Sequence, residues 1–246
     1  MKARRIFMSL CGVIICAISV GGFKHAALGV DPFQSLMAGL DHIVPDTLMS
    51  FGTLYMVVNA ILLCFSLVAD RKNIGLATFI NLFLLGYITE FTMKLLQIWI
   101  PSPALWVRWI FLIVAIVVIC FGSALYMTAN LGVSTYDAVA IVLSGKWKLG
   151  QFRFVRIACD LVCVIAGCAL FLFAGGSWSE IPTIAGIGTI ITAFFMGPLI
   201  DWFNRKVAIP FLNKANKARP TSREHKMLPG KNFLKIRIIL KITVDK

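Results

Sequence analysis

The chain contains the same short pattern twice, and each copy interrupts a long apolar run. Residues 28–33 read Leu-Gly-Val-Asp-Pro-Phe, and residues 131–137 read Leu-Gly-Val-Ser-Thr-Tyr-Asp. Each copy follows an apolar stretch and precedes a short, mostly apolar segment. Because the sequences around the two copies also correspond, we interpret the chain as an internal duplication, and this limits the folds that it can adopt.

Both copies of the pattern predict the start of a new short helix. Asp31 and Ser134 are favourable N-cap residues, whose side-chain oxygens accept hydrogen bonds from the free amides of a helix start. Three positions later, Gln34 and Asp137 complete a capping-box pattern, in which Asp is the less usual second member. The glycine before each cap permits a sharp turn. We therefore expect a helix, a break and a short helix in each copy.

Composition places the chain in a membrane. Apolar residues make up 59% of the sequence, and the mean hydropathy is +0.87; both values lie outside the range of soluble domains. Apolar runs of about 18–20 residues, enough to cross roughly 30 Å of hydrocarbon, recur along the chain. We predict six spans, at about residues 6–23, 51–69, 74–96, 109–130, 152–174 and 183–203.

Two kinds of segment need a separate interpretation. The basic N-terminus followed by residues 6–23 resembles a signal peptide, but this run ends in the duplicated pattern, so we interpret it as a retained first span. The short apolar segments, residues 32–40 and the one that ends at Gly145, are too brief to cross a bilayer as helices. They are predicted to be re-entrant or interfacial.

Charge decides the predicted orientation. With six spans, the N-terminus, the Arg71-Lys72 loop, the loop of residues 146–153 and the C-terminus fall on one side of the membrane. Nearly all Lys and Arg residues are on that side, and cytoplasmic loops carry an excess of these residues. Both termini are therefore predicted to be cytoplasmic. The opposite loops are acidic, with Arg108 as the main exception.

The duplication extends beyond the repeated pattern. The second span aligns with the fifth, so that Asn59 corresponds to Asp160, and the third aligns with the sixth, so that Glu90 corresponds to Asp201. The predicted units are residues 1–104 and 105–205, each with three spans and one short helix. An odd number of spans turns the second unit upside down. Inverted repeats with broken helices are typical of secondary transporters, whose substrate sites lie between the repeats near the midplane.

These motifs resemble those of the YitT/YczE-like family of bacterial integral membrane proteins. The resemblance covers about residues 5–205 and includes both Leu-Gly-Val patterns and the Gly-Ile-Gly-Thr of residues 186–189. Its most specific part is Gly-Pro-Leu-Ile-Asp at residues 197–201. The resemblance implies a location in the bacterial plasma membrane. It supplies no activity and no substrate.

Asp160 is the first candidate functional residue. A charged side chain at the centre of a span costs at least about 2.5–3.5 kcal/mol, so it normally faces a partner or a wet cavity. Arg156 lies four residues earlier on the same helical face. The two residues either form a structural pair that holds the fifth span in the bundle, or they bind a proton or a solute. Asn59 is predicted to face Asp160 across the pseudo-two-fold axis, near the midplane.

Two further acidic residues are candidates for substrate or ion binding. Glu90 precedes Lys94 by four residues, and Asp201 precedes Arg205 by the same spacing, so each is predicted to form an ion pair. The alternative explanation is that these side chains extend to the membrane interface and only solvate their charges there.

The residues at the two predicted helix starts complete the candidate list. Asp137 is either a helix-start residue or a ligand to a bound solute. Phe33 and Tyr136 either pack in the core or line the mouth of a cavity. Asp31 and Ser134 begin helices whose positive dipole ends are predicted to point toward that cavity.

Other site chemistries find no support in the sequence. It shows no nucleophile–base pair, zinc motif or cofactor fingerprint, so we expect neither an enzyme nor a bound metal or cofactor. The seven cysteines lie inside apolar runs and are interpreted as packing residues.

The C-terminal tail, predicted to cover residues 206–246, has a different composition. Residues 204–246 carry twelve Lys and Arg against one Asp and one Glu, and so hold most of the formal net charge of +13. Such a segment next to a span is attracted to anionic lipid headgroups. No nucleic-acid partner is expected, and low order is predicted beyond about residue 213.

The sequence therefore predicts an all-α membrane bundle of two inverted three-helix repeats, each with a short re-entrant or interfacial helix. The leading functional hypothesis is a transporter of a small solute or ion, with its site between the repeats. The alternative is a non-transporting membrane scaffold or regulatory partner, in which the polar residues only hold helices together.

Overall fold

Helices form where the apolar runs predict them. The computed structural model describes residues 2–45 and 47–212, which are helical apart from turns and short connections and contain no strand. Six helical stretches are long and apolar enough to cross a membrane. Five of them are α1 (Lys2–Ala26), α3 (Phe51–Ala69), α4 (Leu76–Trp99), α5 (Leu105–Ala129) and α7 (Phe152–Phe173), and the sixth contains α9 (Ile187–Phe203). The predicted class, an all-helical polytopic membrane protein, is confirmed.

The two short helices also lie where the capping residues place them. These are α2 (Pro32–Ile43) and α6 (Thr135–Gly145). The Asp31 side chain accepts a hydrogen bond from the amide of Gln34 (3.3 Å), and the Ser134 hydroxyl accepts one from the amide of Asp137 (3.1 Å). Both N-caps are thus formed, although the Gln34 side-chain oxygen has no partner and completes no capping box.

The sixth span differs from its prediction at both ends. The sequence predicts one helix over residues 183–203, whereas the structure has a short α8 (Ile181–Ile184), a break at Ala185 and Gly186, and then α9. The helical path continues beyond Phe203 through a π-helical turn (Asn204–Ala208) as far as Leu212. Gly186 allows the break because a Cβ there would lie 2.2 Å from the carbonyl oxygen of Pro182. The predictions for the tail after Leu212 fall outside the described residues.

Helices α1 and α5 pack closely together. A Cβ added at Gly12 would lie 2.7 Å from the carbonyl oxygen of Gly122, so the two backbones touch at this crossing. Further along, the Ser19 hydroxyl donates to the carbonyl of Ala115 (2.6 Å). The contacts run in opposite directions along the two helices, so α1 and α5 are antiparallel. Small residues at the crossing are the usual means by which helices associate in lipid.

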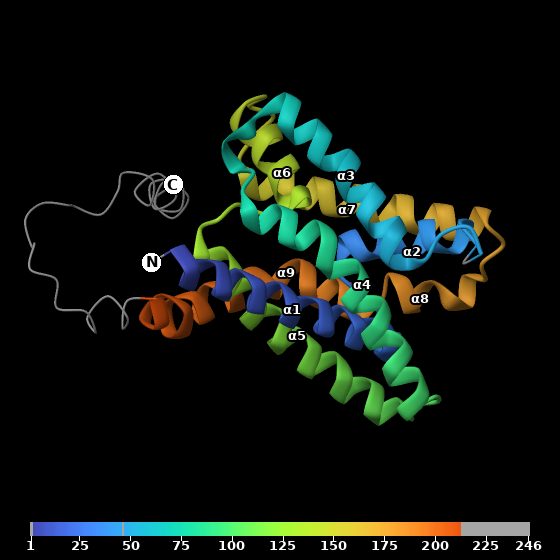
Figure 1. Cartoon of the computed structure of the whole chain (residues 1–246). Coiled ribbons are helices and arrows are strands. Elements are labelled where there is room, and N and C mark those ends of the chain that lie inside the picture. Colours follow the sequence, from blue (N-terminus) through green and yellow to red (C-terminus); the bar gives the residue numbers. More distant parts are fainter. Residues whose placement is uncertain (1, 46, 213–246) are drawn as a thin grey trace, which may run out of the picture. The chain divides into compact units, whose positions relative to one another are not determined.

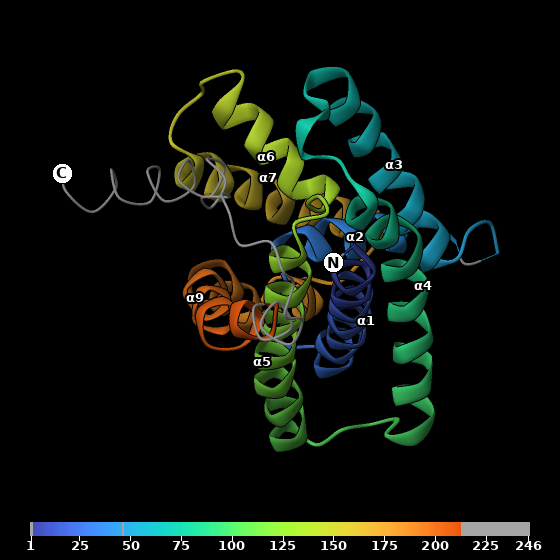
Figure 2. The same ribbon diagram turned by 60° about the vertical axis from the view of Figure 1, so that its left-hand side comes forward.

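The remaining helices form two groups around this pair (Figures 1 and 2). Helix α4 packs beside α1, and α9 packs beside α5. The second group contains α2, α3, α6 and α7, in which α2 lies against α7 and α6 lies against α3. Each short helix therefore packs on a long helix from the other half of the chain. The polar residues discussed below lie where α5, α6 and α7 meet the start of α2.

The breaks before α2 and α6 share one backbone conformation. Ala27 (φ 49°) and Asn130 (φ 52°) end the preceding helices in the left-handed region, and Gly29 (φ 99°) and Gly132 (φ 116°) follow. The two glycines are needed because side chains rarely tolerate such angles. At the first break, Arg108 donates to the carbonyls of Ala26 (2.6 Å) and Ala27. This exception to the charge pattern therefore caps the end of α1.

The breaks also make corresponding contacts with the opposite halves of the chain. The break before α2 exchanges two backbone hydrogen bonds with residues around the start of α9. The break before α6 exchanges two with residues around the start of α4. The four bonds run from Val30 N–H to Ile184 O (3.3 Å), from Val133 N–H to Asn73 O (3.1 Å), from Gly188 N–H to Leu28 O (2.8 Å) and from Ala77 N–H to Leu131 O (3.0 Å). The bonds match in pairs under the alignment of the two halves.

Candidate functional site

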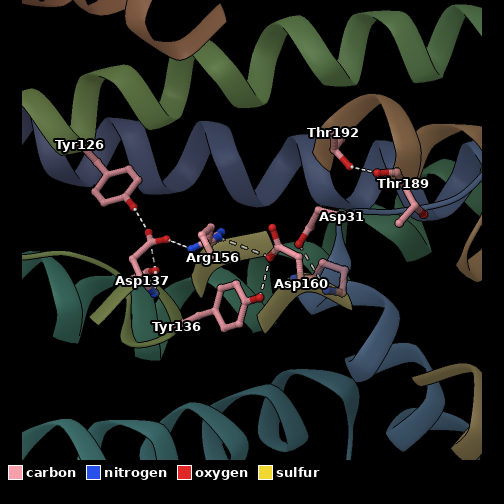
Figure 3. Close-up of polar contacts among 10 residues, drawn as sticks. Asp31, Tyr126, Tyr136, Asp137, Arg156, Asp160, Thr189 and Thr192 are labelled. Carbon is pink, nitrogen blue, oxygen red and sulfur yellow. Dashed lines mark hydrogen bonds and ion pairs between the residues drawn. The ribbon is translucent and has the colours of Figure 1, made fainter. Parts of the chain in front are cut away.

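A guanidinium group between two carboxylates forms the centre of the candidate site (Figure 3). The Arg156 side chain, on α7, forms an ion pair with Asp137 of α6 and a second one with Asp160, where Nε lies 3.3 Å from the carboxylate oxygen. The predicted pair between Arg156 and Asp160 is therefore present. The carboxylates are largely buried, with 18% and 15% of the Asp137 and Asp160 side chains exposed. We call Arg156, Asp137 and Asp160 the charged cluster.

Two tyrosine hydroxyls donate hydrogen bonds to the carboxylates of the cluster. Tyr136 donates to Asp160 (2.5 Å), and Tyr126 of α5 donates to Asp137 (3.1 Å). The Arg156 guanidinium also lies over the Tyr136 ring, 4.4 Å from its centre. Hydrogen bonds to carboxylates are stronger than bonds between neutral groups, so they hold the acidic side chains in fixed positions.

The helix start of α6 explains why Asp137 lies at this place. Ser134 caps the helix and also donates its hydroxyl proton to the Asp137 carboxylate (2.7 Å). A carboxylate in the first turn is stabilised by the positive end of the helix dipole. The loop after α6 leads into α7, and Arg156 in the second turn of α7 lies close enough to Asp137 to form the ion pair. Local helix chemistry and a short connection thus assemble the ion pair.

Asp31 lies beside this cluster, at the start of α2 (Figure 3). Burial raises the pKa of the Asp31 carboxyl, and the negative charge of Asp160 adds to the increase, while the amide of Gln34 opposes it. Asp31 comes from the first half of the chain, whereas the charged cluster belongs to the second half. The site therefore combines residues from both halves.

Asn59 is predicted to face Asp160, and its hydrogen bonds are made with other residues. Asn59 is buried on α3, where its side-chain oxygen accepts a hydrogen bond from the Thr135 hydroxyl of α6. Its amide group donates to the carbonyl of Tyr55 (2.8 Å). Helix α3 packs against α6 and α7 packs against α2. Asn59 therefore meets the short helix of the opposite half, whereas Asp160 accepts a hydrogen bond from Tyr136 of its own half. Asn59 and Asp160 occupy equivalent positions but have different neighbours.

Two other candidates do not join the charged cluster. Glu90 pairs with Lys94 (2.6 Å) and accepts a hydrogen bond from the amide of Gly52 (2.9 Å) at the start of α3. Asp201 pairs with Arg205 (2.5 Å) at a largely exposed position. Both predicted ion pairs are present. The hydrogen bond of Glu90 joins α4 to the start of α3. The ion pair of Asp201 lies near the end of α9, where both side chains are exposed.

Phe33 and Tyr136 stack on each other, with ring centres 5.0 Å apart, and both line a cavity of about 650 Å³. The cavity lies between α2, α3, α6 and α7. Both alternatives considered for these aromatic residues therefore hold at once, because they pack together and also form part of a cavity wall.

Two contacts of the cluster are not predicted from the sequence. Asp137 is predicted as a helix-start residue or a ligand, and its opposite charge to Arg156, just beyond a short loop, is a signal for the ion pair that the prediction leaves unused. Tyr126 gave no signal, because its contact depends on how α5 passes the start of α6. Such contacts between helices have no fixed spacing in the sequence.

Six apolar helical stretches and buried charges define the chain as a polytopic integral membrane protein. Residues 3–205 match the model of a family of unknown function, DUF6198, and the chain belongs to this family. The matched family does not carry the YitT/YczE-like name that the motifs suggest. The match is consistent with the expected bacterial family of uncharacterised proteins.

Two bacterial relatives cover most of the chain. An uncharacterised protein of Haemophilus influenzae is 26% identical over 206 residues, which is 83% of this chain and 85% of the relative. The uncharacterised protein YyaS of Bacillus subtilis is 24% identical over 203 residues, or 82% of this chain and 94% of the relative. No solved structure matches the chain.

Proposed function

We propose that this protein is a secondary transporter that moves a small solute or ion, rather than an enzyme. The observation that carries the proposal is the charge balance of the candidate site. Arg156 offers one positive charge to the carboxylates of Asp137 and Asp160, and Asp31 lies next to them. Surplus carboxylates inside a membrane protein are costly unless they bind protons or cations, and such groups mark ion and proton pathways.

The relation between the two halves of the chain supports this function. We interpret the halves as inverted repeats, because α1 and α5 are antiparallel and the two helix breaks make matching backbone bonds with the opposite halves. In transporters of this type, a site at broken helices between repeats is exposed to each side of the membrane in turn. The charged cluster and Asp31 lie at two such breaks.

We also propose that the protein resides in the bacterial plasma membrane with both termini in the cytoplasm. The bacterial relatives support the compartment. The orientation follows from the Lys and Arg residues, which concentrate on the side of the N-terminus, the Arg71-Lys72 loop and the C-terminus.

Reconstituted protein tests the transport proposal. Liposomes with a trapped pH-sensitive dye are exposed to a panel of amino acids and small cations, and solute-dependent loss of an imposed pH gradient is measured. We expect at least one solute to dissipate the gradient, and Asp160→Asn to abolish this flux without a loss of folded protein. Asp201→Asn is the matched control, because Asp201 is exposed and outside the cluster. The absence of any protein-dependent flux of protons or of a tested solute contradicts the proposal.

A membrane scaffold is the second candidate function. One observation favours it: Arg156 and both carboxylates of the charged cluster have partners within the protein, as expected of a structural pair. In that case Asp160→Asn lowers the thermal stability and the yield of folded protein, whereas a transporter loses flux and keeps its fold.

A further inference from the structure

The cavity beside Tyr136 has the size and lining of a ligand site. Its volume of about 650 Å³ lies within the range of roughly 300–1,000 Å³ that is typical of small-molecule pockets. Its walls are apolar side chains of four helices. They include Leu36 of α2, Val58 and Leu62 of α3, Val139 and Leu143 of α6, and Cys163 of α7.

One edge of the cavity reaches the outer surface of the bundle. Phe154 and Val162 of α7 line the cavity and are 65% and 64% exposed, respectively. Exposed apolar side chains on a helix long enough to span the membrane face acyl chains. This edge therefore connects the cavity to the hydrocarbon of the bilayer, and a molecule that enters here must itself be lipophilic.

The inner wall of the cavity borders the charged cluster. Tyr136 lines the cavity, and its hydroxyl donates to Asp160 (2.5 Å). Cys159, the neighbour of Asp160 in the sequence, also lines the cavity. The charged cluster carries one more negative than positive charge when its members are ionised, and Asp31 lies beside it. In a medium of low dielectric constant such a surplus acts over several ångströms, attracting cations and repelling anions.

We propose that this cavity binds lipophilic monovalent cations, molecules with a bulky apolar body and one positive charge, which enter from the bilayer through the Phe154 and Val162 edge. The apolar walls hold the body, and the acidic surplus behind Tyr136 favours the positive charge. This inference rests on the proposed function and names its substrate class.

A pair of ions with one shape and opposite charges tests the proposal. Binding of tetraphenylphosphonium and of tetraphenylborate to the purified, detergent-solubilised full chain is measured by equilibrium dialysis. We expect saturable binding of the cation, with at least about tenfold weaker binding of the anion, equivalent to about 1.4 kcal/mol. Equal binding of both ions overturns the proposal. So does phospholipid that copurifies with the protein and is not displaced by the cation, since the cavity is then an acyl-chain site.

Two variants locate the binding. Ala158→Phe fills the cavity from α7 and is expected to abolish binding of the cation. Ile157→Phe is the control, because Ile157 is 41% exposed, does not line the cavity, and keeps binding within about twofold. Asp160→Asn, which keeps the size of the side chain, is expected to weaken binding about tenfold. Wild-type affinity in Ala158→Phe and Asp160→Asn, with both proteins folded by circular dichroism, overturns the site.

The outcome also separates this inference from the proposed function. Uptake of another solute in liposomes without binding of tetraphenylphosphonium refutes only the substrate class. Binding that depends on Asp160 in vesicles that accumulate neither the cation nor any other solute refutes transport and leaves a binding site.

Discussion

The two short helices occupy corresponding places in the two halves of the chain, yet they differ in how closely they meet the long helix of the opposite half. A Cβ added at Gly39 would lie 2.2 Å from the carbonyl oxygen of Gly167, so α2 touches the backbone of α7. Helix α6 contacts α3 through Thr135 and Asn59 at its start, and Lys146 after its end donates to the carbonyl of Ala69. Side chains of both helices between these contacts line the cavity. Helices α2 and α7 thus meet backbone to backbone, whereas facing side chains of α3 and α6 line the cavity.

The residues at the contact explain the difference. In the alignment of the halves, Gly39 corresponds to Val142 and Gly167 corresponds to Ser66. Two glycines let the backbones of the first pair meet, and the second pair has a valine and a serine at the equivalent positions. The same architecture therefore gives a direct backbone contact between α2 and α7 and a cavity beside α3 and α6. Charge differs in the same way, since Arg156 and Asp160 of α7 correspond to the neutral Tyr55 and Asn59 of α3.

The largest effect is expected from Gly39→Val, which gives α2 the residue found in α6. Because the nearest atom is backbone at 2.2 Å, the helices must separate, and we expect a loss of more than about 3 kcal/mol in the free energy of unfolding. Denaturant unfolding in mixed micelles measures it. Gly145→Ala is the control, because nothing lies within 4 Å of a Cβ at that position. A stable Gly39→Val protein would show that the close contact is not required.

Arg156→Gln is expected to cost about 2–3 kcal/mol, because two largely buried carboxylates lose their counter-ion. The same unfolding experiment measures the change. Arg205→Gln serves as control, since its ion pair with Asp201 is exposed, and its midpoint is expected to stay unchanged. Equal effects of the two substitutions would remove the distinction between the charged cluster and a surface ion pair.

Tyr136→Phe gives α6 the residue that α2 carries at the corresponding position, Phe33. The substitution keeps the ring and removes the donor to Asp160, so we expect a loss of about 1–2 kcal/mol. Tyr87→Phe removes a hydroxyl that contacts Thr53 at an exposed position (3.2 Å) and is expected to have a smaller effect. If Tyr136→Phe has no effect, Arg156 alone holds Asp160.

The smallest change concerns the helix breaks, where the halves agree in conformation but differ in residue. Ala27 and Asn130 both have positive φ, and asparagine tolerates this region better than alanine. We expect Ala27→Asn to raise the free energy of unfolding by about 0.5–1 kcal/mol and Asn130→Ala to lower it by a similar amount. Changes of the same sign in both variants would show that factors other than the backbone angle dominate at these breaks.

Local rules predicted much of this fold. The apolar runs fixed the number of long helices, and Asp31 and Ser134 marked the first residues of α2 and α6 because capping depends on neighbours in sequence. The ion pair of Arg156 and Asp160 followed from helical periodicity for the same reason. The break at Gly186 was missed, because the surrounding residues are as apolar as those of a continuous span.

The rest depends on which helices pack together. The sequence alignment suggested that Asn59 and Asp160 meet, but equivalent residues face each other only when their own helices are neighbours. Here α3 and α7 each pack on a short helix from the opposite half, and the side chain of Asn59 bonds to Thr135 and Tyr55. Nothing in the sequence indicates the contact of Tyr126 with Asp137, which arises from the distance between helices. The sequence offers a cavity beside Phe33 and Tyr136 only as one of two alternatives.

Each short helix packs on a long helix from the other half of the chain, and this has a consequence for biosynthesis. The ribosome delivers α1 to α4 first, while α7, on which α2 rests, and α5, on which α1 rests, are still unmade. During that interval the face of α2 around Gly39 lacks the α7 backbone that it contacts in the finished fold. The first half cannot finish folding until most of the second half has entered the bilayer, so maturation of this protein is a late event that involves the whole chain.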